Sequence, residues 1–310
     1  MRIAVLDLGT NTFNLVIAEK IENDAFRILH NSKLPVKLGE KGINKGEITE
    51  AAFARGIEAV KIHYQTITEF RADKVKAFGT SAIRSARNGE QFNQAIKKIA
   101  GIEIEIITGE REAELIYLGV RQTHPMDKGN YLILDIGGGS NELIIADKDR
   151  IYWKRSYEIG MARLLELYRP SDPIKPIEIE AINNYLLDKL QDLTEQVKHH
   201  NVKTLLGASG SFETFVSIIH ARKIKDETTD ALTPQSVHIR KNDFNLLYKK
   251  LVQSTKAERE KMKGLEPMRV EMIVFACVFV KFILETLQIE EIFQSNFSLK
   301  EGAIYQLFKN

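Results

Sequence analysis

Residues 7–15 read Asp-Leu-Gly-Thr-Asn-Thr-Phe-Asn-Leu, and residues 135–143 read Asp-Ile-Gly-Gly-Gly-Ser-Asn-Glu-Leu. Each stretch begins with an Asp inside an apolar run, passes through a turn of small or polar residues, and enters a second apolar run. When residues 6–18 are aligned with residues 134–146, six of the 13 positions are identical. The repeat predicts two related halves, each of which opens with a β-hairpin.

The segments outside the two hairpins alternate between strand-like and helix-like patterns. At Ile57, Val60, Tyr64 and Ile67, for example, apolar side chains recur every three or four positions, which is the spacing of one helix face. We expect strands at residues 3–8, 15–18, 26–30, 75–78, 102–107, 131–135, 143–146, 151–157, 202–206 and 291–297. We expect helices at residues 49–70, 88–100, 110–121, 161–168, 177–199, 211–222, 242–253, 270–287 and 300–308. Such alternation is typical of an α/β fold.

The length of 310 residues suits two domains of about 150 residues each. A polar loop with Pro125 and Gly129 separates the first half from the second. We therefore expect one domain over residues 1–124 and another over residues 125–310. The hinge should lie near residues 124–130, and the last helix could pack back on the first domain.

The charges are nearly balanced, with 44 Lys and Arg residues against 42 Asp and Glu residues and a net charge of +2. This balance demands no polyanionic partner, and we expect neither nucleic acid nor a membrane as a partner. The longest apolar run, residues 272–280, is far shorter than the roughly 20 residues of a membrane span. A single cysteine, Cys277, and the lack of a signal-peptide pattern predict a cytoplasmic protein.

The two repeated turns have the features of phosphate-binding loops. Small residues let the backbone approach a ligand, consecutive N–H groups form an anion-binding nest, and hydroxyls add donors. A strand pattern rather than a helix follows each turn, so the context differs from a dinucleotide-binding fingerprint. Either turn alone would be interpreted as an ordinary tight hairpin, whereas two matching copies favour a phosphate site. The candidate residues are Gly9, Thr10, Asn11 and Thr12 in the first turn and Gly137, Gly138, Gly139 and Ser140 in the second.

Carboxylates accompany both turns. Asp7 and Asp135 end the strands that precede the turns, and Glu142 follows the second turn. An Asp beside a phosphate cradle suits Mg²⁺, usually through water molecules. We therefore predict a divalent-cation site at Asp135, Glu142 and Asp7. The alternative for Glu142 is an exposed hairpin residue.

Five segments carry a resemblance to a known family. They are the two glycine turns, residues 79–88 (GTSAIRSARN), residues 106–120 (IITGEREAELIYLGV) and residues 207–211 (GASGS). Together they resemble the Ppx/GppA phosphatases, exopolyphosphatases and guanosine pentaphosphatases of the actin-like superfamily, over nearly the whole chain. The resemblance implies two α/β domains of the actin-like, ribonuclease-H-like type, with the active site in the cleft between them.

The resemblance also implies roles for two charged residues. Glu112 occupies the position of the proposed catalytic base, which takes a proton from the attacking water. Without the resemblance, Glu112 would be interpreted as a favourable residue in the first turn of a helix, and Glu110 and Glu114 are close alternatives. Arg84 matches an arginine that contacts the terminal phosphate, with Arg87 as the competing assignment.

Two further positions follow from the resemblance. The turn with Gly207, Ser209 and Gly210 occupies the place where nucleotide-using relatives hold a nucleoside or its first phosphate. The family's late Arg-Glu-Gly is Lys300-Glu301-Gly302 here. Lysine keeps the charge but loses the planar fork of arginine, so the role of Lys300 is left open.

The function implied by the resemblance is Mg²⁺-dependent release of terminal orthophosphate from inorganic polyphosphate. Guanosine pentaphosphate is the alternative substrate, because both donors end in the same anhydride. A regulator that binds polyphosphate or a guanosine polyphosphate without turnover is a different class, as is an ATP-dependent kinase on the same fold. A homodimer is plausible from the family alone.

Overall fold

The N-terminal hairpin forms the centre of the first of two sheets. The computed structural model describes residues 1–21, 25–222 and 236–309. The first sheet has the order β3-β2-β1-β4-β5, with β2 antiparallel to β1 and β4 parallel to it. Its strands are β1 (Arg2–Leu8), β2 (Thr12–Lys20), β3 (Phe26–Pro35), β4 (Lys74–Gly79) and β5 (Ile104–Ile106).

The second sheet repeats this arrangement in the order β10-β11-β9-β6-β7-β8. The hairpin strands β6 and β7 are antiparallel, β9 is parallel to β6, and β11 is parallel to β9. Its strands are β6 (Tyr131–Ile136), β7 (Asn141–Ala146), β8 (Ile151–Tyr157), β9 (Thr204–Ala208), β10 (Ser236–His238) and β11 (Glu291–Ser295). Apart from β10, the strand order and directions match those of the first sheet. This is the order of actin-like, ribonuclease-H-like domains, so the predicted fold class and the internal repeat are confirmed.

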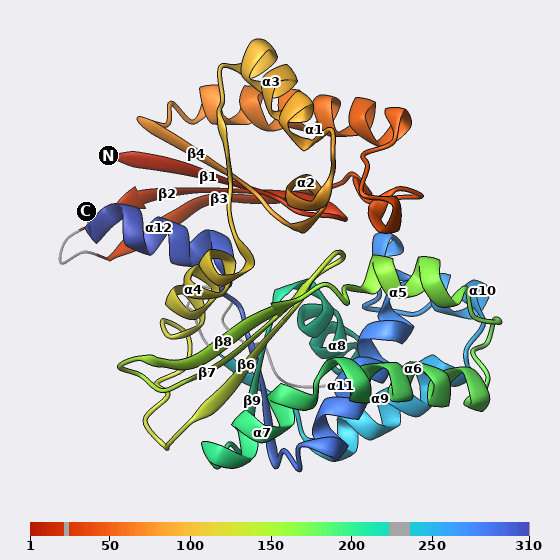
Figure 1. Cartoon of the computed structure of the whole chain (residues 1–310). Coiled ribbons are helices and arrows are strands. Elements are labelled where there is room, and N and C mark those ends of the chain that lie inside the picture. Colours follow the sequence, from red (N-terminus) through yellow and green to blue (C-terminus); the bar gives the residue numbers. More distant parts are fainter. Residues whose placement is uncertain (22–24, 223–235, 310) are drawn as a thin grey trace.

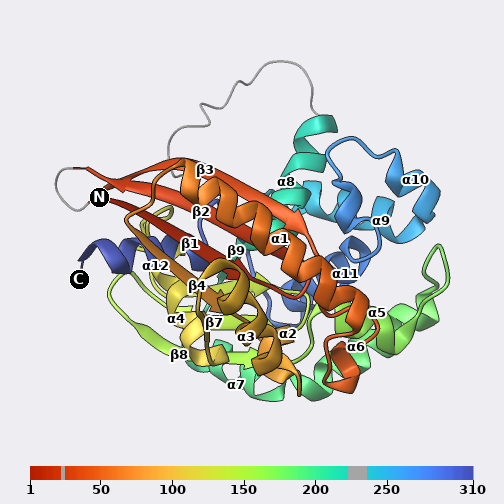
Figure 2. The ribbon, with the colours of Figure 1, turned by 90° about the horizontal axis from the view of Figure 1, so that it is seen from above.

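Helices cover the sheets and also fill the space between them (Figure 1). Helices α1 and α3 pack on the first sheet, and α1 runs across it in Figure 2. Helices α6 to α9 and α11 form the core of the second half. The helical segments are η1 (Ile43–Lys45), α1 (Glu50–Glu69), α2 (Ser81–Ser85), α3 (Gly89–Ala100), α4 (Gly109–Val120), α5 (Met161–Tyr168), α6 (Pro176–Lys189), α7 (Gln191–His199), α8 (Ser209–Arg222), α9 (Lys241–Gln253), α10 (Lys256–Glu260), η2 (Pro267–Arg269), α11 (Ile273–Thr286) and α12 (Leu299–Lys309).

Helices α4 and α12 lie between the two sheets and share one hydrophobic core with residues of both, such as Val5 and Ile133. Two glycines allow these helices to approach closely. A Cβ atom on Gly302 would lie 1.8 Å from the carbonyl oxygen of Leu115, and one on Gly119 would lie 2.1 Å from that of Ser298. A side chain at either position would push the helices apart.

Most expected elements are present, and the differences have local causes. The helix expected over residues 177–199 is two helices, α6 and α7, which are separated at Leu190. Leu190 has φ −113° and ψ 24°, outside the helical range. The short elements α2, α10 and β10 were not expected, because three to five residues are too few to show a periodic pattern.

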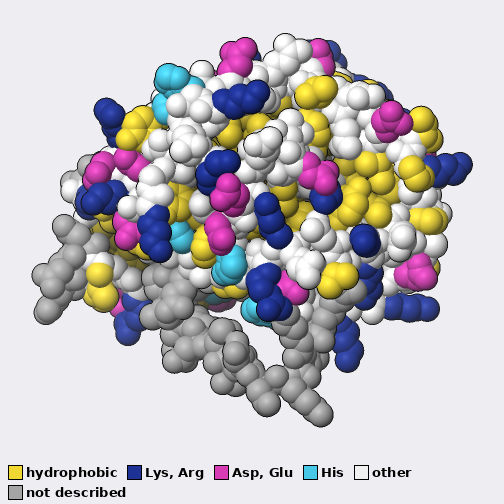
Figure 3. Space-filling view, turned by 90° about the horizontal axis from the view of Figure 1, so that it is seen from below, with side chains coloured by type: hydrophobic (Ala, Val, Ile, Leu, Met, Phe, Trp, Pro, Cys, Tyr) yellow, Lys and Arg dark blue, Asp and Glu magenta, His cyan; other side chains and the backbone are white. Residues whose placement is uncertain are grey.

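The loop at residues 124–130 connects α4 to β6, and α12 contacts α4, β1 and β2. The division into residues 1–124 and 125–310 stays a prediction. On the face shown in Figure 3, Lys and Arg side chains are interspersed with Asp and Glu side chains, as the balanced composition suggests. Among the described residues, every helix is too short or too polar to cross a bilayer.

Candidate active site

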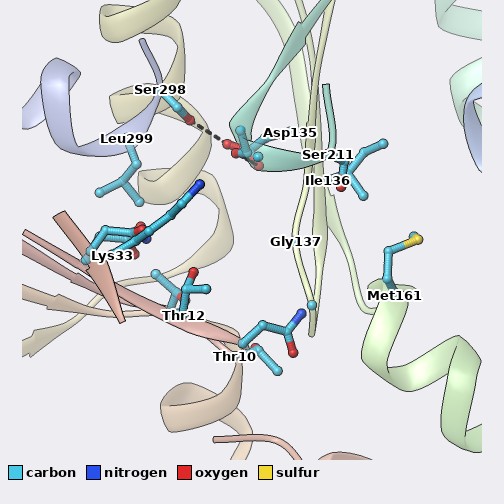
Figure 4. A pocket seen from close by; sticks show the side chains of 18 of the residues that line it. Thr10, Thr12, Lys33, Asp135, Ile136, Gly137, Met161, Ser211, Ser298 and Leu299 are labelled. Atoms are coloured by element: carbon cyan, nitrogen blue, oxygen red, sulfur yellow. Dashed lines mark hydrogen bonds between the residues drawn. The ribbon is translucent and has the colours of Figure 1, made fainter. Parts of the chain in front are cut away.

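A cavity of about 300 Å³ lies where the hairpin turns of the two sheets meet. In Figure 4, Thr10 and Thr12 of the first half lie opposite Asp135, Ile136 and Gly137 of the second. Most of the predicted site residues line this cavity. They are Asp7, Gly9, Thr10, Asn11, Thr12, Glu112, Asp135, Gly137, Gly138, Gly139, Ser140, Glu142, Ser209 and Gly210.

The two turns contain the same backbone hydrogen bond, between the first glycine and the residue three positions later. The Gly9 N–H donates to the carbonyl oxygen of Thr12 at 3.0 Å, and the Gly137 N–H donates to that of Ser140 at 3.1 Å. The tips of the turns nearly touch, since a Cβ atom on Gly138 would lie 2.3 Å from Asn11 Nδ2. Residues of both turns therefore border one cavity, as a phosphate cradle requires.

Ser81, which the sequence analysis did not select, reaches the same place from α2. A Cβ atom on Gly139 would lie 2.6 Å from both Ser81 Oγ and Thr10 Oγ1. The Ser81 hydroxyl is buried and makes no hydrogen bond with any residue that the structure describes. A buried hydroxyl is costly to leave without a partner, so a ligand oxygen in this cavity would satisfy it.

Three carboxylates line the cavity from β1, β6 and β7, and each is held by a neighbouring polar group. Asp7 accepts a hydrogen bond of 3.0 Å from Asn14 Nδ2. Asp135 accepts bonds from the hydroxyls of Ser209 and Ser298 (Figure 4). Glu142 accepts bonds of 2.7 Å from the hydroxyls of Ser140 and Ser156. Glu142 is only 1% exposed, so the alternative of an exposed hairpin residue is wrong.

Burial makes these carboxylates unusually basic. Loss of hydration raises the pKa of Asp7 to about 6 and that of Glu142 to about 7. The pKa of Asp135 is raised for the same reason. For Glu142, the nearby charge of Asp135 raises the pKa further. A cation that enters the cavity would relieve this repulsion between negative charges.

Glu112 lies in the first turn of α4, where the Thr108 hydroxyl caps the helix by accepting from the Arg111 N–H. Its Oε2 accepts a hydrogen bond of 3.0 Å from Arg84 Nη1, which also donates to the carbonyl oxygen of Ile107. Burial raises the pKa of Glu112 well above its usual range, and the charge of Glu142 raises it further, whereas Arg84 lowers it. Arg84 is not among the residues that line the cavity. In this structure its guanidinium therefore contacts Glu112, and any contact with phosphate stays a prediction.

The alternatives to Glu112 and Arg84 lie elsewhere. Glu110 is exposed, and Glu114 binds Arg111 and Lys154. Arg87 is exposed and lies 3.5 Å from Glu47.

The predicted third loop reaches the cavity only in part. Ser209 and Gly210 line it, but Gly207 lies within β9, paired with Leu134 and Gln294. A Cβ atom on Gly207 would lie 2.1 Å from the Phe212 ring. Gly207 therefore serves packing and does not border the cavity.

The described residues contain no group of three or more His, Cys, Asp or Glu side chains that could hold a metal ion on their own. Asp7, Asp135 and Glu142 are instead separate carboxylates around one cavity. This arrangement fits a cation that keeps several water molecules and is bridged to a bound phosphate, which is how Mg²⁺ often binds.

Cationic side chains also line the cavity, and sequence reasoning missed most of them. They are Lys33, Lys37, Arg269 and Lys300. Burial disfavours the charge of Lys300, but Glu301, Glu213 and Asp7 outweigh this effect and raise the pKa of its ammonium group. Lys33 Nζ lies 2.6 Å from Glu266 Oε1, and Lys37 Nζ lies 3.5 Å from Glu271 Oε2. These two ion pairs connect β3 and the loop after it to the second half.

Comparisons with known proteins point to one family. The model of the Ppx/GppA phosphatase family matches residues 16–310. A protein of Haemophilus influenzae, provisionally named an exopolyphosphatase, is 28% identical over 308 residues, which are 99% of this chain and 92% of that protein. A guanosine-5'-triphosphate,3'-diphosphate pyrophosphatase of Aeromonas hydrophila is 26% identical over 99% of this chain, which spans 59% of that protein. The crystal structure of an exopolyphosphatase from Cytophaga hutchinsonii has a TM-score of 0.94 and 38% identity, and the match covers 100% of this chain and 98% of that one.

Proposed function

Because the chain belongs to the Ppx/GppA phosphatase family, we propose that it is an exopolyphosphatase that releases orthophosphate from the end of inorganic polyphosphate. The family consists of phosphatases that hydrolyse phosphoanhydride bonds. The preference for polyphosphate rests on the Cytophaga exopolyphosphatase, which is 38% identical and shares nearly the whole chain. The Haemophilus relative carries a similar name.

The reaction begins with the terminal phosphate held between the two glycine turns. Thr10 and Ser81, whose hydroxyl oxygens both approach Gly139, line the cavity with the backbone of the turns and would supply hydrogen-bond donors. The Glu112 carboxylate removes a proton from a water molecule whose oxygen attacks the terminal phosphorus. The bond from that phosphorus to the bridging oxygen breaks, and the bridging oxygen leaves on the shortened chain.

A divalent cation such as Mg²⁺ would be held by Asp135, Glu142 and Asp7, and it would neutralise charge that develops on the phosphoryl oxygens. Lys300 adds a positive charge on the same side of the cavity. Arg84 keeps Glu112 in place and lowers its pKa, so that more of the carboxyl is ionised at neutral pH. The observation that carries the proposal is this buried Glu112 carboxyl, which borders the cavity between two opposed phosphate turns.

The test is phosphate release with Mg²⁺ from long polyphosphate, tripolyphosphate, guanosine pentaphosphate and ATP, for wild type and Glu112→Gln. We expect polyphosphate to be the best donor and the variant to lose about 10²–10⁴ in kcat while it still binds the chain. Glu110→Gln, on the same helix but exposed, is the control and should keep full activity. Release that survives in Glu112→Gln would disprove the role of this base.

Guanosine pentaphosphate is the second candidate substrate, because the Aeromonas relative is named for the hydrolysis of such a nucleotide. A higher kcat/KM for guanosine pentaphosphate than for any polyphosphate would favour it. Binding of either ligand without phosphate release from any donor would instead favour a regulator.

A further inference from the structure

A second cavity of about 730 Å³ is lined by residues of the loop before α1, of α5 and the loop after it, and of α10 and α11. Figure 1 shows the loop before α1 next to α5. Residues of both halves line it. Lys41 and Lys45 come from the loop before α1, Arg169 ends α5, and Lys256 and Arg259 belong to α10. Cavities of this size with convergent charged groups are typical of binding sites.

Five basic side chains line this cavity against three acidic ones, which are Glu166, Asp172 and Glu271. Two of the acidic groups are already paired. Asp172 lies 3.0 Å from Arg259 Nη2, and Glu271 lies 3.0 Å from Lys256 Nζ. The cavity therefore has an excess of positive charge.

The excess resides on Lys41, Lys45 and Arg169. All three are exposed, and their side chains form no ion pair or hydrogen bond with the part of the chain that the structure describes. Lys41 and Arg169 also adopt left-handed backbone conformations, with φ values of 59° and 42°. At Arg169 this conformation ends helix α5, where the Arg169 N–H donates to the carbonyl oxygen of Leu165.

Apolar side chains form the floor of the cavity, among them Ile174, Val274 and Phe275. Low-dielectric walls strengthen the field of charges at the rim, and a cleft with an excess of one sign attracts ions of the other sign. Glu166 is the one lining carboxylate without an ion pair among the described residues, so the cavity keeps more positive than negative charge. The ligand class that fits three basic side chains at one cavity is an anion with several charges, such as an oligophosphate.

The first turn of α11 and the residue before it separate this second cavity from the active site. Met272 and Ile273 line the active-site cavity, whereas Glu271, Val274 and Phe275 line the second one. The ion pair between Lys37 and Glu271 joins the two, because Lys37 lines the first cavity and Glu271 the second. A phosphate chain that left the active site past Lys37 would therefore pass Glu271, which lines the cavity of Lys41 and Lys45.

We infer that the second cavity binds the distal phosphates of the same polyphosphate chain whose end lies in the active site. This inference rests on the proposed function, and it names long chains as the preferred substrate. Tripolyphosphate would occupy the active site alone, whereas a long chain would also contact Lys41, Lys45 and Arg169.

The experiment measures binding, so that it does not depend on turnover. Glu112→Gln is the background, and Lys41→Gln, Lys45→Gln and Arg169→Gln are combined in it. Isothermal titration calorimetry with long polyphosphate and with tripolyphosphate is repeated at several salt concentrations. The control combines Lys98→Gln, Lys148→Gln and Lys198→Gln, which removes the same charge at exposed positions outside both cavities.

We expect the test variant to bind long polyphosphate about tenfold or more weakly, with a flatter salt dependence, because fewer counterions are released. Binding of tripolyphosphate should stay unchanged, and the control should resemble the background for both ligands. Equal binding of long chains by the test variant and the control would overturn the inference. Tripolyphosphate could instead bind at two sites in the background, with one of these sites lost in the test variant. The second cavity would then bind a separate oligophosphate, and the inference that one polyphosphate chain occupies both cavities would be wrong. Failure of the proposed function would appear separately, as wild-type protein that releases no phosphate from polyphosphate.

Discussion

At the scale of single residues, the contact between Arg84 and Glu112 decides how the proposed base titrates. The carboxyl must be ionised to accept a proton from water, and burial opposes ionisation. Arg84 Nη1, 3.0 Å from Glu112 Oε2, is the cation that counteracts burial. Arg84 thus has a role that does not need direct contact with substrate.

Replacing Arg84 by Gln should raise the pKa of Glu112, since the variant loses the neighbouring guanidinium that lowers it. The acidic limb of the profile of kcat against pH should move to higher pH, and Arg84→Lys should restore part of the shift. Arg87→Gln, whose partner is Glu47 at the surface, should leave the profile unchanged. A uniform loss of kcat without displacement of the limb would show that Arg84 acts on the phosphate instead.

The raised pKa of Glu142 predicts how stability depends on pH. The folded carboxyl has a pKa of about 7 against 4.5 for an ordinary glutamate, so the folded state holds this proton more tightly than the unfolded state. Its contribution to the free energy of unfolding therefore falls as pH rises from about 4.5 to 7, by about 3 kcal/mol in total.

Glu142→Gln cannot ionise and should be more stable than wild type at pH 8, with a difference that vanishes near pH 4.5. Denaturant unfolding in a chelating buffer measures this, and Glu195→Gln, exposed on α7, is the control. Mg²⁺ should stabilise wild type at pH 8 but not Glu142→Gln. A difference between the two proteins that is independent of pH would contradict the titration of Glu142.

Sequence reasoning found Glu112, Asp135 and Glu142 because each belongs to a motif. It missed Ser81, although Ser81 lies within the quoted segment 79–88, and it missed Lys33 and Arg269. Ser81 becomes relevant only when α2 brings its hydroxyl next to Gly139 of the other half. Lys33 lies on β3 and pairs with Glu266, 233 positions away in the chain. No local pattern encodes such tertiary contacts.

At the scale of elements, the local periodicity of apolar residues is sufficient to predict the long helices and strands. It does not predict the end of an element where tertiary packing determines that end. Thr108, for example, caps α4 with a hydroxyl that accepts from the N–H three residues later, which is a contact within a short stretch of sequence. Nothing in residues 177–199 marks the break at Leu190, which is buried in the core of the second half.

The crossing of α4 and α12 predicts a strong effect of Gly302→Ala. The new methyl group would meet the carbonyl oxygen of Leu115 at 1.8 Å, so α12 must move. We expect a loss of about 1–3 kcal/mol in unfolding free energy. Activity should also fall, because the start of α12 carries Lys300 and adjoins Ser298, which bonds Asp135.

Lys309→Ala, at the exposed end of the same helix, is the control and should change neither stability nor activity. Unchanged stability in Gly302→Ala would show that the two helices can separate freely.

At the scale of the whole molecule, the amino-acid composition does not reveal where the positive charge lies, and this distribution matters for a polyanionic substrate. The net charge is only +2, yet basic side chains of both halves border the two cavities. Several of them are held by carboxylates across the cleft. Lys33 Nζ lies 2.6 Å from Glu266 and 3.8 Å from Glu213, and Lys37 lies 3.5 Å from Glu271. A phosphate chain and these carboxylates compete for the same lysines.

Glu266→Gln should therefore favour substrate binding, because it removes the nearer of the two carboxylates that hold Lys33 and also the partner of Arg269. Both partners are about a third exposed, and such pairs contribute at most about 1 kcal/mol. The KM for polyphosphate should consequently fall by up to about fivefold at low ionic strength. Salt screens partly exposed charges, so the difference should disappear at high ionic strength. Glu195→Gln removes the same charge far from the cleft and should leave KM unchanged. A higher KM in Glu266→Gln would contradict this prediction. It would show that the ion pair between Lys33 and Glu266 holds the two halves in the conformation that binds substrate. Lys33 would then act through closure of the cleft rather than through direct contact with phosphate.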